Sequence, residues 1–439
     1  MKVSQTIIKG FSKYTSTEKL EMVCKLFAAP DKTKNSFKSF LHPDGNIQHI
    51  LSQISENTIS NYPLPYNVAP NFLINDKMYM LPMVIEESSV VAAASSAARF
   101  WAERGGFKAH VVSNIKNGQL HFLYKGDPDK LKNALPEIKS HLLDYVKPVT
   151  RNMEARSGGI VSIKLNDRSA DIPGYFQLDV GFNTRDAMGA NFINSCLEEC
   201  SSGMQQWLNT TEGFSEPDYE PLMAILSNYN DNCLVNISVS CNINALDGAA
   251  KGLDGHEFAR RFALAVKIAD IDVHRATTHN KGIMNGVDAL ILATGNDFRA
   301  IEAGAHAWAA RSGKYSSLSR VELSDNHFSF ILEMPMALGT VGGLTGIHPL
   351  ATHSLEMLGK PGAEELMMIA AAAGLANNFA AVRSLTTTGI QAGHMKMHLS
   401  NILLQLKATP DEIEKTTAYF KDKKVSHQAV ATHLAELRK

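Results

Sequence analysis

The sequence lacks the features that mark several large classes of protein. Its five cysteines are odd in number and contain no CxxC pair, so they indicate no disulfide framework. Its 43 basic and 44 acidic residues nearly balance, which gives no charge signal for nucleic acid or an anionic membrane. The beginning of the chain lacks the charged-then-apolar pattern of a signal peptide. We therefore expect a reduced, cytoplasmic protein that binds neither nucleic acid nor a membrane.

Long apolar runs are scarce as well. The longest run of small apolar residues, MMIAAAAGLA, begins at Met367 and is followed by Asn377 and Asn378. It is too short to cross a bilayer, which takes about 20 residues. Apolar residues nevertheless make up 44% of the 439-residue chain, enough for a core divided over roughly two or three domains.

The segment Ala276–Gly313 carries the residues best suited to chemistry. Lys281 lies in what reads as a loop of small residues, an apolar run follows at 287–292, and Asp297 opens an Ala-rich helix. A loop, a short buried strand and a helix start would bring Lys281 and Asp297 together. A neighbouring carboxylate keeps an ammonium charged in a partly dry pocket, where it stabilises a developing oxyanion. The alternative is an ordinary structural ion pair.

A second candidate, Glu87, follows the predicted strand MYMLPMVI directly. Ser88 or Ser89 can cap the helix that follows, so Glu87 lies at a strand-to-helix corner, a frequent place for functional residues. A helix N-terminus favours the ionised carboxylate, and only burial or a suitable neighbour would make Glu87 a proton donor. The alternative is a capping or solvated carboxylate.

The pattern of predicted elements changes after Lys108. Two strands around Asn117–Gly118, a helix and two further strands indicate a compact β-β-α-β-β unit, followed by a helix that Asp186 begins. The small residues of its DAMGAN motif would let a phosphate approach the free N–H groups of the first turn. Because DAMGAN is not GxGxxG, the motif does not indicate a Rossmann fold.

Two glycines, Gly389 and Gly393, precede a polar helical tail with a capping box at Thr409–Glu412. Such a tail is either a hinged lid or a plain helical cap.

His394 and His398 have the i, i+4 spacing of zinc ligands on a helix. The glutamate of HExxH is absent, however, so we expect no metal site.

Six motifs in one order closely resemble 3-hydroxy-3-methylglutaryl-coenzyme A reductase of the soluble bacterial and archaeal type, class II. They are MVIEESSVVAAAS, DAMGAN, HNKGIMNG, ATGNDFRAIEAGAHA, GTVGGLTGIHPLA and GIQAGHMKMH. The resemblance implies an α+β fold, in which a large, mainly helical substrate domain is interrupted by a small, non-Rossmann, ferredoxin-like cofactor domain. The implied boundaries are 1–108 and 231–388 for the large domain, 109–230 for the small domain and 389–439 for a C-terminal flap.

The motifs also carry over site residues. The implied catalytic residues are Glu87, Lys281, Asp297 and His394, and the implied substrate-binding residues are Ser89, Arg275 and Asn285. The implied cofactor-binding residues are Asp186, Ala187, Met188, Gly189, Ala190, Asn191 and Asn228. NAD-preferring sites place an acidic residue at the adenosine ribose. The matching segment 147–152 has none, and its Thr150 and Arg151 favour NADPH over NADH, with NADH still possible.

The implied reaction interconverts HMG-CoA with mevalonate and coenzyme A by two hydride transfers. The implied assembly is a homodimer with active sites at the interface, or a higher oligomer built from it. One departure is visible, because Ser60 stands where relatives have the glycine of ENVIG. Two alternatives are an inactive coenzyme A-binding relative and a metal hydrolase that would use His279, His348, His353, His394 and His398.

Overall fold

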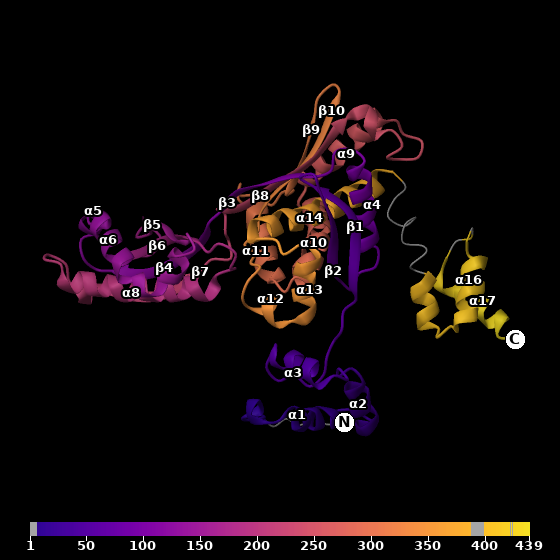
Figure 1. Cartoon of the computed structure of the whole chain (residues 1–439), viewed down its shortest axis with the longest axis horizontal. Helices are drawn as coiled ribbons and strands as arrows, with labels where there is room; N and C mark the ends of the chain where they lie inside the picture. Colours follow the sequence, from indigo (N-terminus) through magenta and orange to yellow (C-terminus); the bar gives the residue numbers. More distant parts are fainter. Residues whose placement is uncertain (1–6, 388–398, 422, 424) are drawn as a thin grey trace.

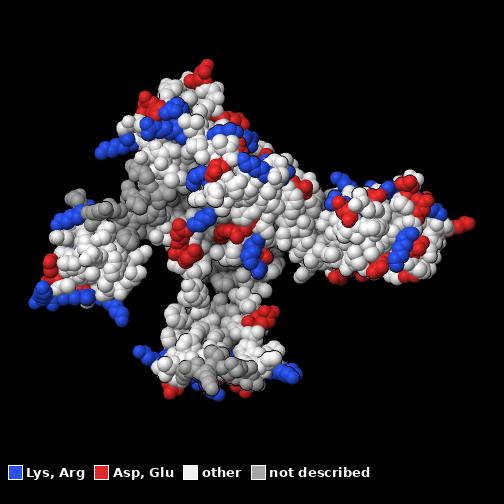
Figure 2. Space-filling view, turned by 180° about the vertical axis from the view of Figure 1, so that it is seen from behind, with Lys and Arg blue, Asp and Glu red and all other residues white. Residues whose placement is uncertain are grey.

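The computed structural model describes residues 7–387, 399–421, 423 and 425–439. Figure 1 shows a large central unit, a small unit beside it, a group of N-terminal helices below and a C-terminal group of helices on the other side. Figure 2 shows acidic and basic residues interspersed over the central and small units. The helices and sheets of these units form separate hydrophobic cores. This mixture of helix and antiparallel sheet agrees with the predicted α+β class.

The central unit is built around the buried helix α14 (Ala363–Thr386), which packs on α10 (Val273–Ala293) and α4 (Val90–Ala102). A Cβ at Gly286 of α10 would lie 2.2 Å from the carbonyl oxygen of Ala373, so only glycine permits this approach of the two backbones. The hairpin of β1 (Tyr66–Ile74) and β2 (Lys77–Val84) packs beside α4. The antiparallel sheet β3-β8-β10-β9 completes the core. Its strands are β3 (Lys108–Asn114), β8 (Cys233–Asn242), β10 (His327–Pro335) and β9 (Ser319–Leu323).

Helix α14 is the one described helix long and apolar enough to cross a membrane, by length and composition alone. Its most apolar window is 83% buried inside the protein. Asn377 and Asn378, which follow the apolar run, are buried as well and donate hydrogen bonds to Ala373 and His279. This packing is that of a core helix.

The remaining elements of the central unit lie around this core. They are η3 (Ile243–Leu246), α9 (Gly255–Ile271), α11 (Phe298–Ala309), α12 (Leu344–Ile347) and α13 (Pro349–Met357).

The small unit has the strand order β5-β6-β4-β7, with all neighbours antiparallel. Along the chain it runs β-α-β-β-α-β, which is the ferredoxin-like arrangement. Helices α6 and α8 pack on each other, and α8 covers β4 and β7. The elements are β4 (Lys116–Tyr124), α5 (Pro128–Asn133), α6 (Leu135–Tyr145), α7 (Lys147–Glu154), β5 (Gly159–Asp167), β6 (Tyr175–Asn183), α8 (Ala190–Thr210), η2 (Glu216–Asp218) and β7 (Tyr219–Leu226). The predicted non-Rossmann fold is confirmed.

The predicted hairpin at Asn117–Gly118 is wrong. Strand β4 runs through both residues, and β3 pairs with β8 in the central sheet instead. Gly118 serves close packing rather than a turn, because a Cβ there would lie 2.7 Å from a Leu197 methyl group on α8. From this pairing we propose that the small unit begins near Ile115 rather than at residue 109.

The N-terminal helices bury few of their side chains. They are η1 (Phe11–Lys13), α1 (Ser16–Cys24), α2 (Pro30–Ser39) and α3 (Gly45–Gln53), and of these only α1 has buried residues. Ser60, in the segment that follows, donates a hydrogen bond of 2.7 Å to the carbonyl oxygen of Phe37 on α2. Ser60 is not among the residues with positive φ, so its replacement of a glycine causes no backbone strain.

The C-terminal helices have a core of their own. Helix α16 (Pro410–Tyr419) begins with the predicted capping box of Thr409 and Glu412, and it packs against α17 (His427–Leu437). Helical residues 399–405 join them. The buried apolar residues of this group are Leu399, Ile402, Leu403, Phe420, Val430 and Leu434. Gly389, Gly393, His394 and His398 lie outside the described residues.

Candidate active site

Lys281 lies in the middle of helix α10, not in the loop that the small residues around it predicted. The apolar run 287–292, predicted as a strand, continues the same helix. Glycine and asparagine weaken helix propensity, but tertiary packing overrides it here. Val287 and Gly286 lie against α14, and Asp272 caps the helix by accepting the N–H of Arg275 at 2.7 Å.

The two residues before Lys281 anchor α10 from its buried side. His279 Nε2 lies 2.6 Å from Ser319 Oγ, and Ser319 donates to Asn378 Oδ1 at 2.8 Å. Asn280 donates to the carbonyl oxygen of Ser316 at 2.9 Å. Burial lowers the pKa of His279 to about 3, so its imidazole is neutral at physiological pH. These contacts fix the rotation of the helix and turn Lys281 outward.

Glu87 meets Lys281 at this outer face. It lies between β2 and α4, at the predicted strand-to-helix corner. Its Oε2 atom lies 2.5 Å from Lys281 Nζ, and the two side chains are 40% and 59% exposed. Residues 194 positions apart in the sequence are thus joined in one ion pair. An exposed pair of this kind contributes only about 0–1 kcal/mol to stability.

The predicted pairing of Lys281 with Asp297 is therefore corrected. Asp297 is the N-cap of α11 and accepts hydrogen bonds from the N–H groups of Arg299 and Ala300. Its carboxylate also faces the Arg299 guanidinium, with Oδ2 and an Arg299 nitrogen 3.0 Å apart. The helix start was predicted correctly, but the local arginine competes with Lys281 for the carboxylate.

Three further residues were assigned to the substrate. Ser89 is the N-cap of α4 and has φ 77, a value that costs a non-glycine residue strain. Asn285 lies one turn after Lys281 on the same face of α10, and Arg275 lies in the first turn of that helix. Asn285 and Arg275 are partly exposed.

The DAMGAN loop lies at the junction of the small and central units. Helix α8 begins at Ala190, with Gly189 as N-cap at φ 89, so Asp186 does not begin it as predicted. Asp186 Oδ1 instead accepts the N–H of Ala363 at the start of α14. A Cβ at Gly189 would lie 2.5 Å from the Thr184 methyl group, which makes glycine necessary here. No side chain caps α8, so its first N–H groups stay available to an anion.

The other residues assigned to the cofactor take different positions. Ala187, Met188 and Ala190 are partly exposed, and Asn191 and Asn228 are exposed. Thr150 lies in α7 with 1% exposure, and its hydroxyl has no hydrogen-bond partner. Its neighbour Arg151 is exposed. Of the two residues predicted to contact an adenosine ribose, only Arg151 offers its side chain to a ligand.

A partly buried carboxyl pair joins α10 to α11 and was not predicted. Asp288 of α10 contacts Glu302 of α11, and one Asp288 oxygen, Oδ1, is buried without a partner. Burial and, to a smaller extent, the neighbouring Glu302 carboxyl raise the pKa of Asp288 to about 8. The pair joins the helix that carries Lys281 to the helix that Asp297 caps. Neither residue belongs to a local pattern that would have revealed the contact.

Replacing Asp288 with asparagine is expected to flatten the dependence of thermal stability on pH. Between its ordinary pKa near 3.8 and the folded value of about 8, the folded state holds a proton that the unfolded state has lost. Stability therefore falls as pH rises through this window. The neutral amide of Asp288→Asn has no such loss. Melting temperatures measured from pH 5 to 9 should fall less steeply in the variant than in the parent. Asp270→Asn, at an exposed carboxylate, is the control, and parallel curves for all three proteins would contradict the assignment.

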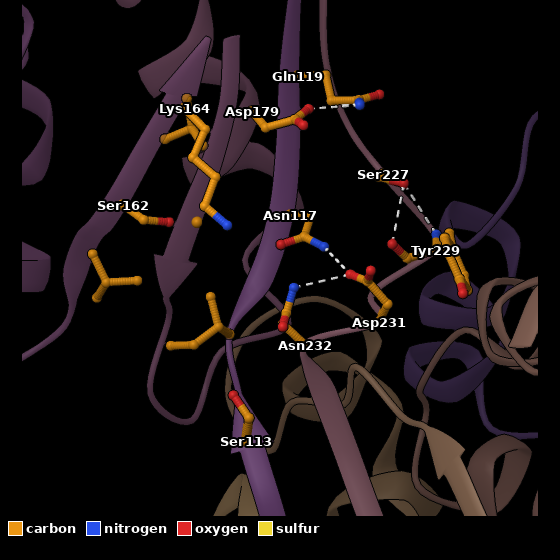
Figure 3. Close-up of a pocket in the computed structure, with 14 residues that line it drawn as sticks. Ser113, Asn117, Gln119, Ser162, Lys164, Asp179, Ser227, Tyr229, Asp231 and Asn232 are labelled. Carbon is orange, nitrogen blue, oxygen red and sulfur yellow. Dashed lines mark hydrogen bonds between the residues drawn. The ribbon is translucent and has the colours of Figure 1, made fainter. Parts of the chain in front are cut away.

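Two cavities of the structure are lined by neither Lys281 nor Glu87. One, of about 430 Å³, is on the open face of the small unit's sheet (Figure 3). Its carboxylates are already engaged, since Gln119 donates to Asp179 and Asn117 donates to Asp231. The other, of about 670 Å³, is mostly apolar and lies between the N-terminal helices and Gly295. Within the described residues, no group of three or more His, Cys, Asp or Glu could hold a metal ion.

Comparison with known proteins gives consistent matches. The family model for hydroxymethylglutaryl-coenzyme A reductase matches residues 16–399. The 3-hydroxy-3-methylglutaryl-coenzyme A reductase of Archaeoglobus fulgidus is 36% identical over 409 residues, 93% of this chain and 89% of that protein. A probable 3-hydroxy-3-methylglutaryl-coenzyme A reductase of Borreliella burgdorferi is 32% identical over 372 residues, 85% of this chain and 82% of that protein.

Solved structures agree with these matches. A class II 3-hydroxy-3-methylglutaryl-CoA reductase from Streptococcus pneumoniae, bound to NADPH in open conformations, has a TM-score of 0.72 and 34% identity. That match covers 87% of this chain and all of the other. A second structure of the reductase from the same organism has a TM-score of 0.73 and 33% identity, over 98% of this chain and 100% of that one.

Proposed function

The chain belongs to the hydroxymethylglutaryl-coenzyme A reductase family, and on that premise we propose that Glu87, Lys281, Asp297 and His394 carry out its chemistry. The family's reaction is the interconversion of HMG-CoA with mevalonate and coenzyme A, by two hydride transfers. The observation that carries the proposal is the ion pair between Lys281 and Glu87, 2.5 Å apart at the outer face of α10.

Lys281 stabilises negative charge on the substrate. A reduced nicotinamide supplies the hydride, which leaves a negative oxygen on the former thioester carbon. An ammonium fixed on a rigid helix meets that oxygen without reorganisation, and electrostatic stabilisation of this kind often contributes more to catalysis than any other effect. Glu87 keeps the ammonium charged and directed at the site. Asp297 stays in the catalytic set through its family motif, with Arg299 as its partner in this structure.

Two protons are needed later in the reaction. Loss of coenzyme A releases a thiolate, and His394 is suited to protonate it because an imidazole titrates near neutral pH. Reduction of the resulting aldehyde leaves an alkoxide, and we assign its proton to the Lys281 ammonium, relayed through the Glu87 carboxylate that lies 2.5 Å from it. Ser89, Arg275 and Asn285 are assigned to binding the HMG portion of the substrate.

The DAMGAN loop suits a dinucleotide. Gly189 packs too tightly for any side chain, and the uncapped start of α8 offers N–H groups to a pyrophosphate. We assign Asp186 to Asn191 and Asn228 to this cofactor. The solved relative from Streptococcus pneumoniae binds NADPH.

We expect a preference for NADPH over NADH that depends on Arg151. The exposed guanidinium can form charge-assisted hydrogen bonds with a 2′-phosphate, which NADH lacks. Arg151→Ala should lower kcat/KM for NADPH about tenfold or more and leave the value for NADH nearly unchanged. Both cofactors are compared at equal salt, with Arg168→Ala as the control. A parent enzyme that prefers NADH, or an unchanged ratio in Arg151→Ala, would contradict the assignment.

We further propose that the protein is a homodimer and that its N-terminal helices contact the partner. Large apolar side chains are exposed on and near these helices, among them Phe40, Ile54 and Tyr62, the last at 91%. All three also line the 670 Å³ apolar cavity that reaches Gly295. Exposed apolar surface of this kind marks an interface. A second copy of the chain bound to this surface would lie beside the active site.

The dimer predicts a particle of roughly twice the 48.0 kDa chain mass in sedimentation velocity. Tyr62→Asp should shift the population toward monomer, because a charge would be buried at the interface. Lys9→Asp, at an exposed polar position in the same region, is the control. A parent protein that sediments as a monomer at micromolar concentration would overturn the proposal.

The cysteines are consistent with a reduced cytoplasmic protein. All five thiols are free and four are buried. Burial raises the pKa of both Cys196 and Cys200 to about 12, so these thiols are unreactive. Titration of the unfolded, unreduced protein with a thiol reagent should count five free thiols.

The reaction itself has a simple test. Adding HMG-CoA to the protein and NADPH should oxidise the nicotinamide, and a chelator should leave the rate unchanged. Failure of oxidation would favour an inactive coenzyme A-binding relative, and loss of activity on chelation would favour a metal enzyme.

A further inference from the structure

Lys116 is a buried cation without a carboxylate partner. It is the first residue of β4, and its side chain is 1% exposed. Its ammonium donates hydrogen bonds to Thr184 Oγ1 at 2.6 Å and to the carbonyl oxygen of Ala187 at 2.8 Å. Both acceptors are neutral, and no described carboxylate forms an ion pair with it. Lysine is almost never fully buried unless its charge is paired. The described part of the chain therefore buries a lysine without a carboxylate to balance its charge.

The strand places this charge beneath the DAMGAN loop. Residues alternate between the two faces of a strand. Figure 3 shows Asn117 and Gln119 on the open face of the sheet, beside the polar cavity. Lys116 points to the opposite face, the one that α8 covers, where Gly118 contacts Ile193. The Lys116 ammonium thus lies directly behind residues 184–187, just before the uncapped start of α8.

The neighbouring charges do not neutralise Lys116. Asp186, in the loop, directs its carboxylate to the N–H of Ala363 on α14. Cys233, on β8, is a neutral thiol because burial raises its pKa to about 11. Burial lowers the pKa of Lys116, and Cys233 and Asp186 oppose this shift only in part. The start of α8 adds further positive potential. Lys116 and the start of α8 thus favour an anion at this place, and the carboxylates in the region are Asp186, which is bound to Ala363, and Glu364, which acts on Cys233.

We propose that the missing counter-charge is the pyrophosphate of the bound dinucleotide. Lys116 is then a positioning residue, which holds the DAMGAN loop and attracts this dianion across the loop. The inference rests on the proposed cofactor site and adds to it a residue outside the motif. Thr184 completes the arrangement, because its hydroxyl accepts from Lys116 and donates to the carbonyl oxygen of Ala187 at 2.7 Å. A charge in the low dielectric of the protein interior attracts a neighbouring anion more strongly than the charge of a surface lysine would.

This arrangement couples cofactor binding to a proton. A bound dianion favours the charged ammonium and so raises the pKa that burial lowers in the free protein. In the alkaline range the free protein therefore loses a proton from Lys116, and binding of NADPH takes one up. A purely structural lysine, with the same charge in both states, would show no such uptake.

Isothermal titration of the full chain with NADPH from pH 7 to 10, in two buffers of different ionisation enthalpy, tests this coupling. The parent should take up protons at alkaline pH and bind more weakly there. Lys116→Met should bind NADPH at least about tenfold more weakly at pH 7 and take up no proton. Lys19→Met, at a buried lysine of the N-terminal helices with 7% exposure, should behave as the parent.

The outcomes separate this inference from the cofactor site itself. A folded Lys116→Met that binds NADPH with parental affinity would overturn the role of Lys116 and leave the cofactor site standing. Absence of proton uptake by the parent would do the same, and that measurement needs no variant to fold. A parent that does not bind NADPH at all would instead remove the proposed function.

Discussion

Lys281→Ala is expected to slow reduction of HMG-CoA by about 10²- to 10³-fold or more, because it removes the cation that stabilises the oxyanion. The fold should survive. Lys281 is 59% exposed, its ion pair with Glu87 contributes little to stability, and alanine is the best helix former for α10. Initial rates at saturating NADPH, with melting temperatures for each protein, measure both effects.

Lys267→Ala is the matched control. Lys267 lies on the neighbouring helix α9, is 66% exposed and also pairs with a carboxylate, Asp270. It should keep both the activity and the stability of the parent. Near-normal turnover in Lys281→Ala would remove the mechanism, and a large fall in its melting temperature would show that α10 depends on this lysine structurally.

Glu87→Gln and His394→Gln are expected to differ in the step they impair. Glu87 supports Lys281 and relays the proton from Lys281 to the alkoxide, so Glu87→Gln should slow reduction of both HMG-CoA and free mevaldehyde by about 10²-fold or more. His394 acts on the thiolate, which only the thioester releases, so His394→Gln should slow HMG-CoA reduction far more than mevaldehyde reduction. Initial rates with the two substrates measure the split.

The adjacent Glu86 provides the control for the carboxylate. Glu86→Gln changes the same residue type at an exposed position and should leave both rates near those of the parent. If His394→Gln slows both reactions equally, His394 orients the C-terminal segment or the cofactor and does not protonate sulfur. If Glu87→Gln spares mevaldehyde reduction, the proton reaches the alkoxide by a route that does not include Glu87.

The sequence predicted the elements whose signals are local. The strand-to-helix corner at Glu87, the helix start at Asp297 and the capping box at Thr409 each depend on a few neighbouring residues, and the structure confirms all three. The small unit was predicted as non-Rossmann for a similarly local reason, since DAMGAN lacks the spacing of a Rossmann turn.

Features that depend on packing could not be predicted in this way. The glycines near Lys281 indicated a loop, yet they allow α10 to approach α14, a contact between segments about 90 residues apart in sequence. The hairpin predicted at Gly118 was wrong for the same reason, because the missing side chain lets α8 pack against the strand. The pairing of Lys281 with Glu87, rather than Asp297, follows from this helix orientation and from the competition of Arg299. Burial of Thr150 likewise depends on tertiary structure.

The stoichiometry of nicotinamide oxidation to thiol release tests the central claim most directly. With a limiting amount of HMG-CoA and excess NADPH, absorbance of the nicotinamide and a thiol reagent report the two products in one experiment. The assigned reaction predicts two molecules of NADPH oxidised for each thiol released. Thiol release without NADPH oxidation would indicate hydrolysis, and a ratio of one would mean that the reaction stops at the aldehyde, either of which contradicts the account.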